Sequence, residues 1–380
     1  EMETMNEFRV APGDSVQNAI EEAAAAGGGK VVLAPGTHRS GTIYLRDNVE
    51  LHLPAGSRLL GGSEPEDYSD LPTELYGEYA PCKCSKSLIA AAGVSNIAIT
   101  GTGVIEGGGP AFYDRDRLEG GFFYAKTEKP RPRLLQLARC RNVRLEGVTF
   151  FNSPGWTTWL IECEDVTVTG LRIYGDPRMI NNDGLHFFGG KRIAVSNCFI
   201  ATGDDALVIR AGRAWQQDSE CLAEDVVVTN CVLESSCQGV RVGCSCDDKV
   251  RHCRFSNLII RSRNVGIYLD NPLRYLTVAC KGPLLDLDDV SFENISVESL
   301  TKPIAVEVEE GLALRRIGRV CFRNIAFRAR EPLCFTGSSQ TVLEEIRLSD
   351  VTGTISGPET IRSQFVGSLI MDRCEISRKP

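Results

Sequence analysis

The sequence lacks the segments that would assign it to a membrane or to a nucleic acid. It has no run of about 18 apolar residues, which a helix needs to span a bilayer. It also has no block of lysine and arginine, and its formal net charge is −8, from 42 basic and 50 acidic residues. A nucleic-acid backbone or an anionic membrane surface would repel such a chain. We therefore predict neither a nucleic acid nor a membrane as a partner.

A leader segment is missing as well, because the N-terminus has no basic stretch followed by an apolar one. We expect a cytoplasmic protein, although the start at Glu1-Met2-Glu3 leaves a trimmed signal peptide and secretion open. Aromatic residues make up only 7% of the 380 residues, against 37 glycines and 42% hydrophobic residues. This composition suits a long core with many tight turns.

The cysteines lack the spacing of a disulfide framework or of a zinc site. Their number, 15, is odd, and the pairs Cys82/Cys84 and Cys244/Cys246 are separated by one residue instead of the two typical of zinc knuckles. We interpret them as small, buried side chains in a reducing compartment. The prediction is that the protein holds no metal and no cofactor.

A repeat of short strands is the strongest structural pattern in the chain. Alternating apolar residues end at a glycine, asparagine or aspartate, and successive units are 23 to 37 residues apart. The turn positions are Gly147, Gly170, Asn197, Asn230, Asn257, Asn294, Asn324 and Asp350. Asparagine suits these turns because it tolerates left-handed backbone angles and can form amide ladders between units.

Each unit is too short to bury a hydrophobic face alone, so the units must stack as parallel coils. Residues 14–27 differ and read as a helix that ends at Gly27-Gly28-Gly29, which we expect to cap the open end of the stack. The prediction is an all-β fold: a single right-handed parallel β-helix with an N-terminal capping helix. One domain spans 1–380, with the cap and first coils in 1–60, loop-rich coils in 61–135 and regular coils in 136–380.

Two acidic motifs interrupt this regular pattern, and they lie one coil apart. Asp183 stands in Asn181-Asn182-Asp183-Gly184, and Asp204 and Asp205 follow Gly203 at a distance of 21 residues. Stacked coils are separated by about 4.8 Å, so three carboxylates would crowd one patch of surface. Mutual repulsion raises the proton affinity of at least one of them, as glycoside hydrolysis by an acid and a base requires. Ordinary turns and a calcium site remain alternative interpretations.

These motifs resemble the Asn-Thr-Asp and Asp-Asp motifs of glycoside hydrolase family 28, which includes polygalacturonases and rhamnogalacturonan hydrolases. The resemblance covers nearly the whole chain and includes the 101–107 segment and Ser153-Pro-Gly-Trp156. It implies a β-helix and an inverting mechanism. Asp204 would protonate the leaving oxygen, while Asp183 and Asp205 would hold and deprotonate the attacking water.

The chain departs from the family pattern on the next two coils. Gln238, in Cys237-Gln238-Gly239, stands where the family has the histidine of Gly-His-Gly, and Tyr268-Leu269-Asp270 stands where it has Arg-Ile-Lys. Asp270 would repel a uronate instead of binding it. We therefore expect a neutral or modified sugar and not plain polygalacturonate. The candidate substrate-binding residues are His186, Arg210, Trp215, Gln238, Arg241, Tyr268 and Asp270.

The predicted function is hydrolysis of a glycosidic bond in an oligosaccharide derived from a pectin-like or other plant or microbial glycan. The alternatives are a non-catalytic carbohydrate-binding β-helix, or a lyase or epimerase on the same scaffold. The loops at 67–84 and 111–132 are long enough to wall off one end of a groove, which favours attack at chain ends.

Overall fold

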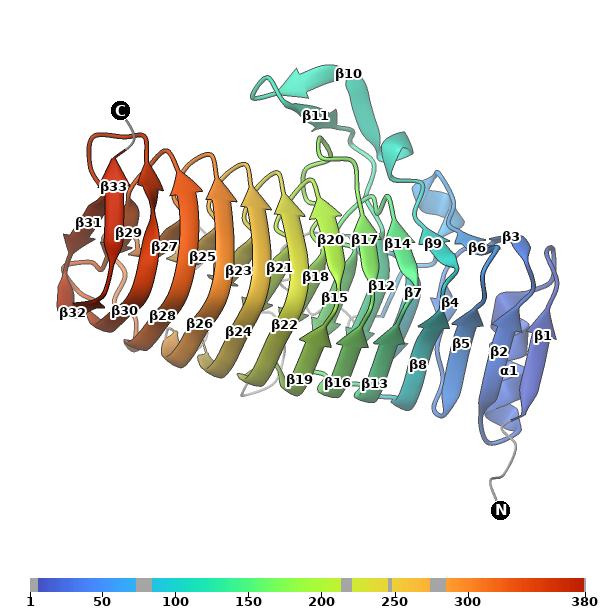
Figure 1. Ribbon diagram of the computed structural model, residues 1–380. Helices are drawn as coiled ribbons and strands as arrows, with labels where there is room; N and C mark the ends of the chain where they lie inside the picture. Colours follow the sequence, from blue (N-terminus) through green and yellow to red (C-terminus); the bar gives the residue numbers. More distant parts are fainter. Residues whose placement is uncertain (1–5, 73–83, 213–220, 245–247, 274–284, 379–380) are drawn as a thin grey trace.

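The computed structural model describes residues 6–72, 84–212, 221–244, 248–273 and 285–378. The chain winds into a right-handed parallel β-helix, as predicted, and the coils follow the chain order from the N-terminus to the C-terminus (Figure 1). None of the described helices is long and apolar enough to cross a membrane.

One face of the β-helix is a parallel sheet of 11 strands, and each coil contributes one of them. These strands are β4 (Ile43–Tyr44), β7 (Ser87–Ala92), β12 (Arg133–Ala138), β15 (Thr158–Ile161), β18 (Leu185–Phe188), β21 (Leu207–Arg210), β23 (Val240–Gly243), β25 (Ile267–Asn271), β27 (Ile304–Val308), β29 (Leu333–Thr336) and β31 (Ile361–Gln364).

A 20-stranded sheet forms the other two faces, which meet at the asparagine and glycine turns. Before the turn lie β1 (Glu7–Val10), β2 (Gly29–Leu33), β5 (Val49–Leu53), β8 (Ser95–Gly101), β13 (Arg141–Glu146), β16 (Glu164–Thr169), β19 (Gly190–Ser196) and β32 (Val366–Asp372). After it lie β3 (Gly36–Arg39), β6 (Ser57–Leu60), β9 (Val104–Glu106), β14 (Thr149–Phe151), β17 (Arg172–Tyr174), β20 (Phe199–Thr202) and β33 (Glu375–Arg378). Five longer strands continue through the turn: β22 (Ala223–Ser235), β24 (Lys249–Ser262), β26 (Asp286–Ser299), β28 (Arg316–Ala329) and β30 (Leu343–Ile355).

The turn residues behave as predicted. Asn197, Asn230, Asn257, Asn294, Asn324 and Asp350 all have φ between 50° and 57°. The side-chain amide of Asn324 donates to Asn294 over 2.7 Å, and that of Asn294 donates to Asn257 over 3.3 Å. The amides therefore tie neighbouring coils together at a position where other side chains would strain the backbone.

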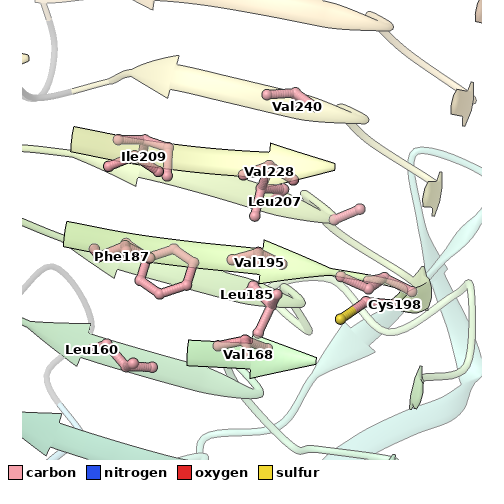
Figure 2. Packing of buried hydrophobic residues seen from close by; sticks show 14 of the residues in the cluster. Leu160, Val168, Leu185, Phe187, Val195, Cys198, Leu207, Ile209, Val228 and Val240 are labelled. Atoms are coloured by element: carbon pink, nitrogen blue, oxygen red, sulfur yellow. The ribbon is translucent and has the colours of Figure 1, made fainter. Parts of the chain in front are cut away.

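The core fills the interior of the solenoid with one layer of apolar side chains per coil. Leu185 of β18 pairs with Leu207 of β21, which in turn pairs with Val240 of β23, and all three are fully buried (Figure 2). Cys198, close to the same layers, is also buried, as the sequence predicted. Further along the stack, Phe255 and Phe292 lie parallel with ring centroids 4.6 Å apart, and Phe322 continues the column at 5.2 Å.

The helix α1 (Val16–Ala25) covers the N-terminal end of the stack, as predicted. The Ser15 hydroxyl accepts a hydrogen bond from the Asn18 amide and so caps the first turn. The buried residues of α1, which are Val16, Ile20 and Ala23, face the first coil. The apolar interior of that coil is thereby kept from water.

One insertion leaves the β-helix. After the 3₁₀ turns η1 (Pro65–Asp67) and η3 (Gly109–Phe112), the strands β10 (Tyr113–Glu119) and β11 (Phe123–Lys126) form an antiparallel hairpin. It projects from the stack beyond the ends of β14, β17 and β20 (Figure 1). The Tyr124 amide donates to the Arg178 carbonyl oxygen over 2.8 Å, and the Arg178 guanidinium lies 5.5 Å from the Tyr124 ring. These contacts fix the hairpin against the turn that follows β17.

Candidate active site

A cleft of about 920 Å³ lies between the hairpin and the turns that lead into β18, β21 and β23. Those turns place Asp183, Asp204 and Asp205 in the cleft, so the one-coil spacing brings the three predicted carboxylates together. They are 2%, 9% and 1% exposed. The Gly184 amide donates to the Asp205 carbonyl oxygen over 2.9 Å, which shows that the two motifs occupy adjacent coils.

The residues that flank the carboxylates hold the turns in place. The Asn182 side chain accepts from the Gly203 amide over 3.2 Å and donates to the Ser153 carbonyl oxygen over 3.3 Å, so it ties three successive coils together. A Cβ atom on Gly203 would lie 2.1 Å from the Met179 carbonyl oxygen, and one on Gly184 would lie 2.3 Å from that of Ala206. The two glycines of the motifs are therefore required for close approach of the coils.

Burial and mutual repulsion keep protons on this cluster. Burial raises the pKa of Asp183 well above its ordinary value, and the charges of Asp204 and Asp205 raise it further. Burial and the Asp205 charge raise the pKa of Asp204 to about 6, although amide donors oppose the shift. One of those amides, that of Asn181, donates to Asp204 Oδ2 over 2.8 Å. A site of this kind can hold a proton near neutral pH and release it.

Asp205 has different partners. Its Oδ2 lies 3.0 Å from Arg241 Nη1, and its Oδ1 accepts from the Gln238 amide over 3.2 Å. The Arg241 guanidinium also makes a two-point contact with Asp270, from Nε to Oδ1 over 2.9 Å and from Nη2 to Oδ2 over 2.6 Å. Arg241 therefore bridges one carboxylate of the cluster and a second acidic residue behind it.

This bridge corrects the prediction that Asp270 would repel a uronate. Asp270 is 4% exposed and neutralised by Arg241, so it does not face the cleft as a free charge. Tyr268 is partly buried: its ring packs against Val265, Ala305 and Cys334, and it is not part of the cleft lining. Its contact with a sugar stays a prediction.

The prediction for His186 is also wrong. Its ring is fully buried, 4.2 Å from the Trp156 ring between centroids, and it does not line the cleft. Burial lowers its pKa well below the ordinary value, and the Arg210 and Arg133 charges lower it further. In the described chain its two ring nitrogens make no hydrogen bond, and Nδ1 lies 3.8 Å from Asp183 Oδ2. His186 is a neutral packing residue beneath the carboxylates.

Three other predicted residues line the cleft: Arg210, Gln238 and Arg241. The Arg210 guanidinium lies 5.6 Å from the Trp156 ring, which lines the cleft and also packs in a buried cluster with Trp159. Trp215 lies outside the described residues.

The hairpin and the segment that follows it supply residues that the sequence did not single out. Arg117 and Lys126 line the cleft, and neither forms an ion pair within the described ranges. Arg131 donates to Asn181 Oδ1 over 2.9 Å and to the Tyr113 hydroxyl over 2.7 Å, so it fixes the wall to the first acidic motif. The length of the 111–132 loop was the sequence feature that indicated a wall at this end of the groove.

A cation has one conceivable position among the described residues. Ligand atoms of Asp204, Asp205 and Cys237 lie within 4.8 Å of one another. Arg241 and backbone amides, however, already bond to the two carboxylates. This set of partners suits carboxylates that exchange protons better than carboxylates that bind a metal.

The fold and the cleft define a β-helical protein with a buried cluster of three carboxyl groups. The model of the glycosyl hydrolases family 28 matches residues 76–310, more than half of the chain. The chain therefore belongs to this family.

Individual relatives are distant. A probable polygalacturonase of Vitis vinifera is 25% identical over 195 residues, which are 50% of this chain and 38% of that protein. An endo-polygalacturonase of Pectobacterium carotovorum subsp. carotovorum is 23% identical over 339 residues, 86% of this chain and 80% of that protein. The chain spans about a third to a half of the length of several plant relatives.

The solved structure of an exopolygalacturonase from Thermotoga maritima has a TM-score of 0.78 at 21% identity and covers 98% of this chain and 93% of its own. A family 28 exopolygalacturonase from Yersinia enterocolitica has a TM-score of 0.65 at 19% identity and covers 98% of this chain and 78% of its own. At these identities the likeness establishes the fold.

Proposed function

We propose that this protein hydrolyses a glycosidic bond in a pectin-derived oligosaccharide, with inversion at the anomeric carbon. The observation that carries the proposal is the cluster of Asp183, Asp204 and Asp205 in one cleft, with raised pKa values at Asp183 and Asp204. An inverting enzyme needs a protonated acid on one side of the bond and a carboxylate that activates water on the other.

Asp204 acts as the general acid. It is the most exposed of the three carboxyls, and its pKa of about 6 lets it carry a proton at mildly acidic pH and give it up. Asp205, with an arginine and an amide on its oxygens, serves as the base that takes the proton of the attacking water. Asp183 Oδ1, which accepts no hydrogen bond from the described residues, orients that water.

The substrate carries uronate groups, and the hairpin side of the cleft attracts them. The hairpin and the following segment contribute Arg117, Lys126, Lys129 and Arg131 to the lining, against the two acids Glu119 and Glu128. Family members named polygalacturonase or exopolygalacturonase make a galacturonate chain the first substrate to test. The wall that the hairpin forms favours attack at chain ends.

The test is a panel of pectic polysaccharides and oligogalacturonates, followed by reducing-end assay and product analysis. The wild-type protein should release reducing ends, and Asp204→Asn should not. An aryl glycoside with an acidic phenol as leaving group should restore turnover to Asp204→Asn, because that leaving group needs no protonation, but not to Asp205→Asn. A product with the ultraviolet absorbance of an unsaturated uronate would contradict hydrolysis and indicate a lyase.

A further inference from the structure

Arg241 contacts the carboxylate cluster directly, with its Nη1 3.0 Å from Asp205 Oδ2. The Arg241 side chain is 11% exposed, and the side chains of its partners Asp205 and Asp270 are 2% and 6% exposed. Because water screens such pairs poorly, breaking one leaves a buried charge without compensation. The ion pair between Arg241 and Asp205 is therefore strongly coupled to the protonation state of the carboxylate cluster.

The coil arrangement gives the guanidinium a fixed direction. Arg241 of β23 stands between Val208 of β21 and Tyr268 of β25 in the strand register. The two-point contact with Asp270, on the later coil, leaves Nη1 aimed at Asp205, on the earlier one. The Tyr268 ring lies 5.9 Å from the guanidinium carbon and closes the outer side. Asp270 and Tyr268 thus hold the arginine in one orientation.

The charge of Arg241 extends to the whole cluster. It lowers the otherwise raised pKa of both Asp183 and Asp204, while burial and mutual repulsion raise them. Burial opposes the charge of Arg241 itself, but Asp205 and Asp270 raise its pKa well above the ordinary value. The other ionisable groups that bear on the cluster and the arginine include Arg210, Tyr113, His186, Cys237, Cys244 and Tyr268.

We propose that Arg241, clamped by Asp270, is a positioning residue that orients the Asp205 carboxylate and keeps it available to accept the proton of the attacking water. The proposal rests on the hydrolytic function above. Asp270 thereby has a role in the site, because it holds the Arg241 guanidinium toward Asp205, the proposed base. Arg241 acts through Asp205, so its removal should affect kcat and the pH profile more than KM.

The experiment compares Arg241→Met, Arg241→Lys and Asp270→Asn in the full chain. With oligogalacturonates as the probe, Arg241→Met should lose about 100- to 1,000-fold in kcat/KM, nearly all of it in kcat. Its pH profile should move to higher pH, because the pKa of Asp183 and of Asp204 rises without the cation. Arg241→Lys should recover roughly tenfold, since it restores the charge but not the two-point contact.

Arg254→Met is the matched control, because it breaks an inter-coil pair with Asp289 on the outer surface, away from the cleft. It should leave kcat, KM and the pH profile unchanged. A loss in Arg241→Met confined to KM, with an unmoved pH profile, would overturn the proposal and make Arg241 a substrate ligand. Unchanged kinetics in that variant would overturn it as well and make the bridge purely structural.

A second measurement separates this proposal from the function it rests on. If the wild-type protein cleaves no pectic probe, the proposed function fails, and the pH dependence of unfolding still tests Arg241. Stability should fall more steeply between pH 5 and 8 in Arg241→Met than in the wild type, because more protons bound to the folded cluster must be lost. Equal slopes would refute the influence of Arg241 on the cluster.

Discussion

Replacing Asp204 by asparagine should stabilise the folded protein at neutral pH while it removes the proposed acid. The folded-state pKa of Asp204, about 6, lies above its ordinary value of 3.8. The folded state therefore binds a proton more tightly than the unfolded chain, and stability falls as pH rises from about 4 to above 6. Ionising Asp204 costs roughly 3 kcal/mol at pH 7.5 by this difference. Asparagine avoids that cost.

Part of the gain is lost, because asparagine accepts more weakly from the Asn181 and Asp205 amides that bond to Asp204. We expect Asp204→Asn to raise the free energy of unfolding by about 1–3 kcal/mol at pH 7.5 and by almost nothing at pH 4. Denaturant unfolding followed by tryptophan fluorescence measures both values.

The matched control for that experiment is Asp165→Asn. Asp165 is an exposed carboxylate whose pKa is lowered by its hydrogen bonds to Arg192, so its stabilising effect is present above pH 4 and is lost as pH falls. Its replacement should not stabilise the protein at any pH. If Asp204→Asn were less stable than the wild type at pH 7.5, the assignment of a raised pKa to buried Asp204 would be refuted. A gain in unfolding free energy that does not vary with pH would refute it as well.

Four further results are expected. The value of kcat/KM should decrease as pH rises through about 6, where Asp204 loses its proton. A decrease that begins only above pH 8 would contradict the role of Asp204 as the acid. Arg117→Gln combined with Lys126→Gln should raise KM for oligogalacturonates about tenfold and leave KM for their methyl esters nearly unchanged. Phe292→Ala should cost about 3–5 kcal/mol of unfolding free energy, because it empties the middle of the phenylalanine column. Asn294→Ala should cost about 1–2 kcal/mol and Asn294→Gly less, since only alanine also strains the left-handed backbone.

The sequence was informative wherever a structural feature repeats with the coil. Turn asparagines such as Asn257 and Asn294 recur because each coil needs one residue with a left-handed backbone, and this need is local. The proximity of Asp183 to Asp205 could be predicted for the same reason, since their separation in the chain equals one coil. Such features depend on the period of the fold alone.

Features that depend on side-chain direction across coils could not be read from the spacing. Asp270 looked like an unpaired charge because its partner, Arg241, lies 29 positions earlier, and nothing local links the two. His186 lies three residues after Asp183, but its ring turns beneath Trp156 and away from the cleft. The hairpin has no period at all, so its basic residues could be placed on a wall only by its observed packing.

The apolar floor of the cleft explains why a β-helix can keep such a cluster. Trp156 and His186 pack in contact beneath the carboxylates, and the Arg133 guanidinium lies 5.2 Å from the Trp156 ring. This floor excludes water and so raises the proton affinity of Asp183 and Asp204, at a cost in stability. A globular domain with one small core could lose its fold to that cost. Here the coils on either side contribute their own packed layers, so the strain stays confined to the three coils that form the cleft.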